Sequence, residues 1–261
     1  MGPAERLLRS RGTLAVRGAM TMPSSDARLF DVLYTCRAMR RLKPDPVPEE
    51  TLLQLVDAAL HAPSGSNAQN WRFVIVRDRA QKERMRDLWR KTWNFYLDTV
   101  AVAEARPGED LAARNRMLAA ATWQLDNFLD IPAIVCVCVE RDELMTKVMA
   151  SPSTLVKLVS HFGIGGAVRL ARSMGRTSGI ADGATAYPAV QNLLLAARAL
   201  GLGAVLTTQH FFVPGEFEKV LGLPSTATLA AIVPVGWPTG KFGPTTRPDA
   251  RSVTSWDRYG T

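Results

Sequence analysis

The sequence contains no long apolar run. A membrane-spanning helix needs roughly 18–20 consecutive apolar residues, whereas the longest candidate here, IPAIVCVCV at 131–139, has the length of a buried strand. Residues 1–25 also lack the continuous apolar segment of a secretory signal. We therefore expect neither a membrane-spanning segment nor a membrane partner.

Residues that form disulfides and metal sites are scarce. The 261 residues include three Cys and three His, and His61, His161 and His210 are scattered. Cys136 and Cys138 lie two apart in a predicted strand, where their side chains share a face but are poorly placed for a disulfide. We expect reduced, structural thiols, a cytoplasmic location and no metal site, with a CxC metal pair as the alternative.

Common signatures of nucleotide and hydrolytic sites are also missing. There is no GxGxxG after a strand, no GxxxxGK[ST], no GxSxG and no HExxH. The chain also lacks helix-turn-helix, zinc-finger and RNP patterns, so we expect no nucleic-acid partner despite a net charge of +8. That charge fits either an unspecific basic surface or a pocket for a phosphorylated ligand.

The chain does have enough apolar residues, 47%, for a sizeable core. Residues 1–26 show no core pattern, and we expect them to be a disordered N-terminal extension. Met20 or Met22 as the true start would explain this extension, and an Arg-rich targeting or dimer-capping arm is the alternative. Residues 27–261 are predicted to form a single domain.

Helix and strand patterns alternate through that domain. Helices are predicted at 27–36, at about 48–62, over most of 80–128 with a break near 106–110, at 187–200 and near 214–222. Strands are predicted at 71–77, 131–139, 204–208 and 228–238. Without a repeating βαβ register, this favours an α+β fold with a sheet between helices.

Two stretches are harder to interpret. Glycines and a proline interrupt short apolar pieces between 141 and 180, and this excursion is interpreted either as a lid or as a contact with a partner. Residues 239–261 are rich in Pro, Gly and Arg, and we expect an extended C-terminal arm.

A cluster of arginines precedes the second helix. Arg37 and Arg40 lie three apart on one helix face, with Arg41 nearby. Guanidinium groups this close repel one another unless an anion or carboxylates lie between them, and their planar donors suit phosphate. The alternative is a solvated basic helix end paired with Asp45 or Glu49.

A polar loop, PSGSNAQ at 63–69, separates the second helix from the first strand. Gly65 lets a ligand approach the backbone closely, and Ser64, Ser66, Asn67 and Gln69 offer donors and acceptors. These groups suit a neutral heteroaromatic or polyhydroxylated ligand. The alternative is a turn that only stabilises itself.

These motifs together resemble one family. RAMRRLKPDPVP, AALHAPSGSNAQNWRFVIV, YPAVQNLLLAARALGLGAVLTT and IVPVGWP occur in this order over residues 30–255 and resemble the FMN-dependent nitroreductase family. The resemblance implies a central, mostly antiparallel sheet flanked by helices, with a C-terminal arm exchanged in a homodimer. It also implies FMN at the subunit interface, with both subunits contributing to each site.

The resemblance assigns FMN-binding roles to the Arg-rich segment and to the arm. In the family's RRSxR segment, Cys36 stands in place of the first Arg and Ala38 in place of Ser, which weakens two expected contacts. Arg37 resembles a phosphate ligand, and Arg40 a ligand of the ribityl chain or the pyrimidine. Phosphate closure from the arm is expected from Arg247, with Lys241 as the alternative. The segment contributes Arg37, Ala38, Met39 and Arg40.

The resemblance also assigns the polar loop and the strand at 204–208 to the flavin. The family's APSxxNxQPW matches this loop, with Asn70 in place of Pro. Backbone groups of the strand are expected beside the flavin N5 edge. The residues concerned are Pro63, Ser64, Gly65, Ser66, Asn67, Gln69, Leu206, Thr207 and Thr208.

The implied function is an oxidoreductase that passes a hydride from NADH or NADPH through flavin N5 to a nitroaromatic, a quinone or a related aromatic acceptor, by a ping-pong mechanism. No catalytic acid or base is assigned. Two alternatives are a family offshoot with other chemistry, such as reductive dehalogenation or flavin destruction, and a non-catalytic FMN-binding protein.

Overall fold

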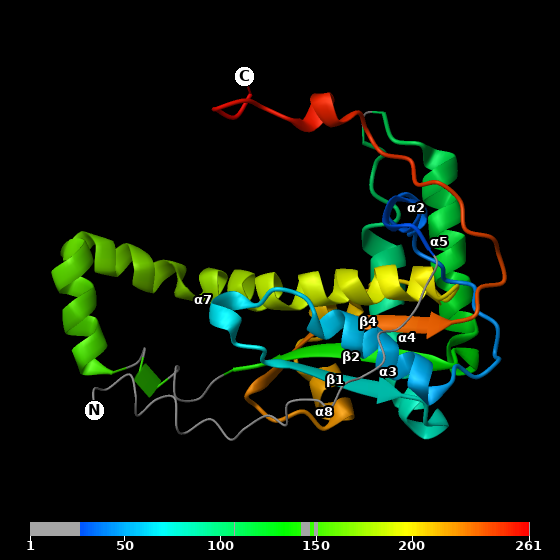
Figure 1. Cartoon of the computed structure of the whole chain (residues 1–261), viewed down its shortest axis with the longest axis horizontal. Helices are drawn as coiled ribbons and strands as arrows, with labels where there is room; N and C mark the ends of the chain where they lie inside the picture. The colour runs from blue at the N-terminus through cyan, green and yellow to red at the C-terminus, as the bar shows by residue number, and fades with distance from the viewer. Residues whose placement is uncertain (1–26, 107, 142–146, 149–150, 261) are drawn as a thin grey trace.

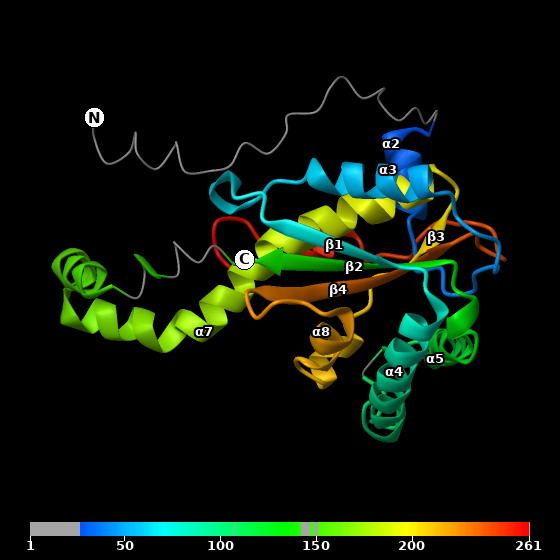
Figure 2. The same cartoon turned by 90° about the horizontal axis from the view of Figure 1, so that it is seen from below.

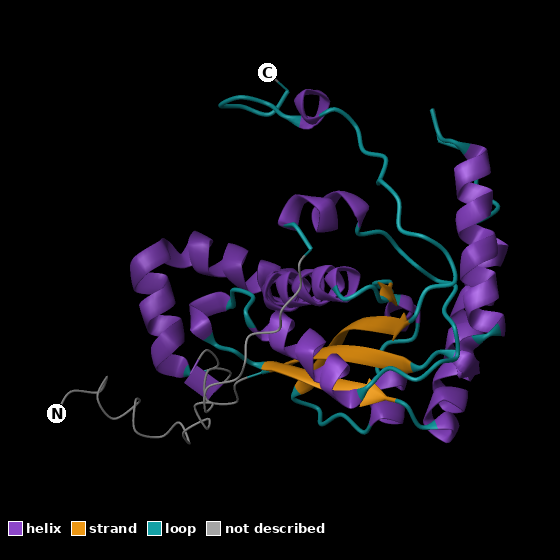
Figure 3. Cartoon of the chain, turned by 45° about the vertical axis from the view of Figure 1, so that its right-hand side comes forward, coloured by secondary structure: helices purple, strands orange, loops and turns teal. Residues whose placement is uncertain are grey.

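The computed structural model describes residues 27–106, 108–141, 147–148 and 151–260, without the side chains of 174–178. The extension predicted at 1–26 lies outside the described residues. Helices and one antiparallel sheet make up the described chain (Figures 1 and 3), so the predicted α+β class is confirmed.

Four strands form the sheet in the order β1-β2-β4-β3, and each neighbouring pair is antiparallel. Strands β2 and β4 in the middle are buried along almost their whole length, as expected for strands that are covered on both faces. The strands are β1 (Trp71–Val76), β2 (Ala133–Glu140), β3 (Gly203–Ala204) and β4 (Ala227–Gly236).

Helices cover both faces of the sheet (Figure 2). Helix α3 (Glu49–Leu60) and the C-terminal half of α7 (Pro152–Ala199) cover one face. Helices α4 (Arg79–Thr99) and α8 (Glu216–Leu221), with the end of α5 (Leu111–Asp126), cover the other. The predicted break near 106–110 falls between α4 and α5.

Side chains of β2 alternate between these two layers. Val135 packs in the α3–α7 layer, whereas Cys136 and Cys138 pack in the α4–α8 layer. Both thiols are free, and burial raises the pKa of Cys138 to about 12. The two cysteines therefore serve as core residues, as the sequence predicts.

Short helical segments connect these elements. They are α2 (Leu29–Thr35) and the 3-10 turns η1 (Gly65–Asn67), η2 (Phe128–Asp130), η3 (Gln209–Phe212) and η4 (Ala250–Val253).

Helix α7 agrees only in part with the sequence-based expectation. The glycines between 141 and 180 predict short, interrupted pieces, and the structure has one such interruption, at Gly163, after which α7 continues as a long helix from beyond the sheet to Ala199 (Figure 1). Ser151 caps its start by accepting a hydrogen bond from the Thr154 N–H, and Pro152 suits the first turn. Gly163, with φ 67° and ψ 168°, marks the bend inside it. Among the described helices, α7 included, none has the apolar length required to cross a bilayer.

Strand β3 is shorter than the predicted strand at 204–208, and Pro234 explains why. Thr207 and Ile232 exchange both backbone hydrogen bonds in the same register as β3 and β4. Pro234, two residues after Ile232, points its backbone toward the same neighbour, but proline has no N–H to donate to the opposite Val205. The ladder is therefore interrupted between Ala204 and Thr207.

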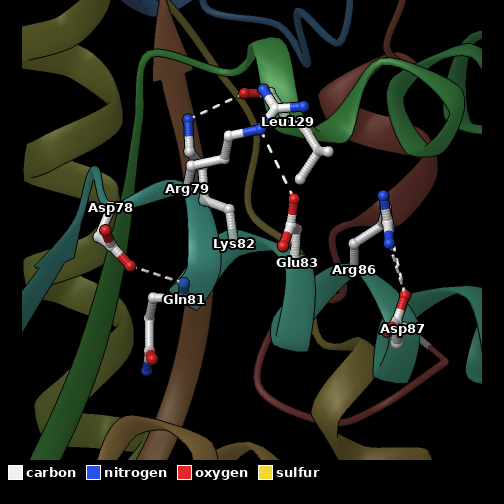
Figure 4. Close-up of polar contacts among 8 residues, drawn as sticks. All are labelled: Asp78, Arg79, Gln81, Lys82, Glu83, Arg86, Asp87 and Leu129. Atoms are coloured by element: carbon white, nitrogen blue, oxygen red, sulfur yellow. Dashed lines mark hydrogen bonds and ion pairs between the residues drawn. The ribbon is translucent and has the colours of Figure 1, made fainter.

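The start of α4 is capped and anchored (Figure 4). Asp78 accepts a hydrogen bond from the Gln81 N–H at 2.7 Å. The buried Lys82 donates from Nζ to the carbonyls of Leu129 and Ile131, each at 2.9 Å. Burial lowers the pKa of this amine. These contacts fix α4 against the segment that leads into β2.

The C-terminal arm has two parts. Its first part packs on its own chain, because the N–H of Thr239 donates to the Arg41 carbonyl and the N–H of Thr245 to the Tyr34 carbonyl. Its last part, around η4, extends away from the body (Figure 1). Trp256 there is 78% exposed.

Candidate functional site

A cavity of about 310 Å³ lies between the Arg-rich segment, the end of α7 and the C-terminal arm. Its lining contains four arginines, Arg37, Arg40, Arg198 and Arg247, and we call it the arginine pocket. Ala38 and Leu206 also line it. Five of the residues predicted from sequence therefore meet in one place.

Positive charge in the arginine pocket is uncompensated. Its lining contains no Asp or Glu. Within the described part of the chain, none of the four arginines forms an ion pair with a carboxylate. Arg40 is partly buried, and this burial lowers the pKa of its guanidinium. An anion in the pocket would relieve this repulsion, and phosphate matches the guanidinium geometry.

The backbone of the Arg-rich segment is held by the neighbouring strand. The N–H of Met39 donates to the Ala204 carbonyl at 3.1 Å. The segment lies so close to Gly203 that a Cβ there would be 2.9 Å from Leu42 Cδ2 and 3.0 Å from Met39 Cβ. Met39 is absent from the pocket lining, so it anchors the segment from behind.

Arg198 comes from the last turn of α7 and is held in place by two contacts. Its Nε donates to the Thr35 hydroxyl at 2.9 Å, and its guanidinium lies 4.1 Å from the centre of the Phe242 ring. Cys36, which also lines the pocket, places its thiol 3.7 Å from the Leu194 carbonyl. Burial raises the pKa of this thiol, and the charge of Arg198 partly opposes that rise.

The arm contributes Arg247 to the pocket and leaves Lys241 out of the lining. Arg247 donates to the Thr246 carbonyl at 2.8 Å, which orients its guanidinium without neutralising it. Of Arg247 and Lys241, the two arm residues expected to contact the phosphate, Arg247 is the one that lines the pocket.

A second cavity, also of about 310 Å³, adjoins the first, and Arg40 and Leu206 line both. Three aromatic side chains of α4, Trp89, Trp93 and Tyr96, contribute to its wall, and we call it the aromatic pocket. Thr207 and Thr208, two further residues predicted from sequence, line this pocket rather than the first.

The polar loop does not meet the arginine pocket within the chain. Pro63, Ser64, Gly65, Ser66, Asn67 and Gln69 are absent from the linings of both cavities. The loop and α2 lie at opposite ends of the body (Figures 1 and 2). Trp71, just after the loop, donates to the Thr185 carbonyl, and Thr185 precedes Arg198 on α7 by 13 residues, or about 20 Å.

The loop backbone is unusual. Ser66, Asn67 and Gln69 have φ between 49° and 53°, a region that non-glycine residues rarely adopt. Internal hydrogen bonds support this shape, from Gln69 N–H to Ser64 Oγ at 3.1 Å and from Gln69 Nε2 to Asn67 Oδ1 at 3.0 Å. The loop is thus a preformed, exposed polar surface that does not contribute to this chain's own arginine pocket.

Sequence reasoning missed the contribution of α7. Gln191, Leu194 and Arg198 line the arginine pocket and are spaced i, i+3 and i+7, so they share one helix face. A glutamine and an arginine at that spacing on an otherwise apolar helix were the available signal. Phe242, in the arm, carried no comparable signal.

The sequence profile of the nitroreductase family matches residues 34–237. The chain belongs to the nitroreductase family. It is therefore an oxidoreductase of the flavoprotein type, and the family resemblance seen in the sequence is confirmed. The matched residues include the Arg-rich segment, the polar loop and most of both pocket linings.

Named relatives support this membership. The chain is 29% identical over 236 residues to an NADH dehydrogenase of Thermus thermophilus, covering 90% of this chain and 98% of the relative. It is 27% identical over 210 residues to an iodotyrosine deiodinase of Thermotoga neapolitana, covering 80% and 88%. A crystal structure of iodotyrosine deiodinase bound to FMN and 3-iodo-L-tyrosine has the same fold, with a TM-score of 0.59, 24% identity and coverage of 90% and 100%.

Proposed function

We propose that this chain is an FMN-dependent oxidoreductase that takes a hydride from NADH or NADPH and delivers it to a nitroaromatic, a quinone or a related aromatic acceptor. The observation that carries the proposal is the arginine pocket, four guanidiniums without a lining carboxylate, in a member of a flavoprotein family. FMN, when bound, supplies the hydride chemistry between the reductant and the acceptor.

The residues present fit FMN. Arg37, Arg198 and Arg247 would hold its phosphate, because bidentate guanidinium–phosphate contacts would offset the mutual repulsion of these side chains. The charge of Arg40, a partly buried side chain at the border of the two pockets, would favour negative charge on the ring system. The backbone of Leu206 to Thr208 would lie along the ring edge.

The polar loop supports a homodimer. Within one chain, Ser64 to Gln69 lie far from the arginine pocket, so they can contribute to a flavin site only from a second copy. We propose that each site takes its arginines from one subunit and its polar loop from the other, in the cytoplasm. No residue is assigned as an acid or a base.

Reductive dehalogenation is the second candidate, because relatives named iodotyrosine deiodinase cover most of this chain. The aromatic pocket argues against an amino acid as the acceptor. A zwitterion needs a partner for its ammonium group, yet Arg40 is the one charged side chain in the described lining. We therefore favour an acceptor without an ammonium group.

The test begins with the purified protein, which should be yellow and release FMN on denaturation. Oxidation of NADH or NADPH should accelerate on addition of menadione or nitrofurazone, and 3-iodo-L-tyrosine should not be deiodinated. A colourless protein that fails to quench the fluorescence of added FMN would contradict the proposal. A yellow protein without turnover would instead support a non-catalytic FMN-binding protein.

A further inference from the structure

The C-terminal arm is joined to the body by few hydrogen bonds. Within the described chain, Thr245 makes the last backbone hydrogen bond from the arm to the body, from its N–H to the Tyr34 carbonyl at 2.9 Å. Two residues later, Arg247 lines the arginine pocket. The position of the arm after Thr245 therefore depends on what Arg247 meets in that pocket.

The arm also rests directly on two arginines of the pocket. The centre of the Phe242 ring lies 4.1 Å from the guanidinium carbon of Arg198. Gly243 lies beside Arg37, because a Cβ on this glycine would be 3.8 Å from Arg37 Nη1. The side chains that would bind an anion therefore also form the surface on which this part of the arm lies.

Docking of the arm brings like charges together. Arg247 enters a cavity of about 310 Å³ whose lining already contains three guanidiniums of the body and no Asp or Glu. Like charges in one small cavity repel each other, and more strongly where water is partly excluded. Bidentate contacts with a phosphate group reverse this, because each guanidinium then faces a shared negative charge. Whether the arm lies on the body therefore depends on whether a phosphate group occupies the pocket.

We propose that a phosphate group in the arginine pocket docks the C-terminal arm onto the body, with Arg37 and Arg198 binding it from the body and Arg247 from the arm. The inference rests on the proposed function in one respect, that FMN is the source of the phosphate; free inorganic phosphate offers the same chemistry. Docking of the arm and binding of the phosphate then strengthen each other by the same factor. Loss of the phosphate releases the arm, including its exposed end around Trp256.

Hydrogen exchange of the arm measures its docking without turnover, because the N–H groups of Thr239 and Thr245 are bonded to the body only while the arm lies on it. Exchange of residues 239–248 is followed by mass spectrometry in the full-length protein without bound flavin. The four conditions are chloride, inorganic phosphate at the same ionic strength, riboflavin and FMN. We expect inorganic phosphate and FMN to slow this exchange roughly tenfold relative to chloride and riboflavin. Exchange of α8, on the far face of the sheet, should be the same in chloride and in inorganic phosphate.

Two side chains of the same shape at position 247 separate charge from packing. Arg247→Gln removes the cation of the arm, so inorganic phosphate should no longer slow exchange of the arm. Arg247→Glu supplies a carboxylate to the arginines of the body, so its arm should exchange more slowly in chloride than that of Arg247→Gln. Arg251→Gln, the same change at an exposed arginine of the arm outside the pocket lining, should respond to phosphate as the wild type does.

Equal exchange of the arm in chloride, inorganic phosphate and FMN overturns the inference, as does slowing by riboflavin that equals slowing by FMN. An Arg247→Glu arm that exchanges as fast as the Arg247→Gln arm overturns it too. Slowing by FMN without slowing by inorganic phosphate supports it and identifies the phosphate ester as the source. A protein that binds no FMN but whose arm is slowed by inorganic phosphate contradicts the proposed function and leaves this inference standing. A yellow, active protein whose arm responds to neither contradicts this inference alone.

Discussion

Individual arginines of the arginine pocket can be tested for contact with the FMN phosphate by comparing FMN with riboflavin, which lacks that phosphate. Arg37 and Arg247 line the pocket together, from the Arg-rich segment and from the arm. A charge-assisted hydrogen bond contributes about 1.5–3 kcal/mol. Arg37→Ala and Arg247→Ala should therefore each weaken FMN binding roughly tenfold or more, and should weaken riboflavin, which lacks the phosphate, far less. Fluorescence quenching of both flavins measures the two affinities.

Lys241→Ala is the matched control for this experiment. Lys241 is an exposed cation of the same arm outside the pocket lining, so its removal should leave the ratio of the two affinities unchanged. If riboflavin and FMN weaken equally in the arginine variants, the arginines act through folding and not through the phosphate.

His210 gives the molecule a pH dependence of stability. The ring is 3% exposed, and burial lowers its pKa to about 4, although a backbone contact with Leu229 partly opposes this. Neither ring nitrogen makes a hydrogen bond of ordinary geometry to a described residue. Below pH 6.5 the unfolded chain binds a proton at His210 that the folded chain does not bind. The free energy of unfolding therefore falls as the pH drops toward 4, where this loss is complete.

The gap between 6.5 and about 4 corresponds to roughly 3 kcal/mol at most. Denaturant unfolding at pH 7.5 and pH 4.5 should therefore show a smaller stability loss in His210→Leu than in the wild type. His161→Gln, at an exposed position, should behave as the wild type. Parallel curves for wild type and His210→Leu would show that the ring is not the titrating group.

At the scale of elements, the contact between β3 and the Arg-rich segment positions the pocket. A Cβ on Gly203 would lie 2.9 Å from Leu42 Cδ2, closer than side chains tolerate. Gly203→Ala should therefore push the segment away from the sheet, cost about 1–3 kcal/mol of stability and weaken FMN binding. Thermal unfolding and flavin titration measure both effects.

Gly240→Ala controls for that change. Its Cβ would also approach Met39, but at 3.9 Å, an ordinary contact. We expect its stability and FMN affinity to match the wild type. A Gly203→Ala variant that is as stable as Gly240→Ala would mean that Leu42 moves aside without disturbing the pocket.

Local patterns predict most elements of the sheet and its covering helices, because apolar periodicity reports burial directly. They fail in two places where the effect of a single glycine or proline depends on its neighbours in the fold. The glycines between 141 and 180 predict several breaks, but the structure has a break at Gly163 and a helix that continues through the later glycines. Pro234 lies inside a strand that reads as continuous, and its missing N–H shortens the neighbouring β3.

The same limits apply to the pockets. Arg37 and Arg247 are recognisable from their motif context, whereas Arg198 belongs to a helix whose apolar pattern predicts a core role. Gln124, which lines the aromatic pocket, is not predictable from the sequence for a related reason. A glutamine on a helix is normally solvated, and the burial of this one follows only from how α5 packs. The positions of these residues in the pockets depend on tertiary packing, which no short sequence motif predicts.

At the scale of the whole molecule, several large apolar side chains are left uncovered. They cluster on α2, on the first part of α7 and on the end of the arm. Phe30, Phe162, Ile164 and Trp256 are each more than 60% exposed. Contiguous exposed apolar surface is uncommon in monomers and marks sites of association. Together with the separation between the polar loop and the arginine pocket, this exposed apolar surface favours a second subunit over an isolated chain.

The last prediction is that the protein is an obligate homodimer held partly by its C-terminal arm. The arm packs on its own chain as far as Thr245, and from the end of η4 onward its side chains Val253, Trp256 and Tyr259 are at least 70% exposed. Deleting residues 249–261 leaves Arg247 in place and removes these apolar contacts, so dimer and bound FMN should be lost together. Light scattering with flavin absorbance measures both. A truncated chain that stays dimeric and fully loaded with FMN would rule out this role for the arm, and a wild-type monomer at micromolar concentration would rule out the dimer itself.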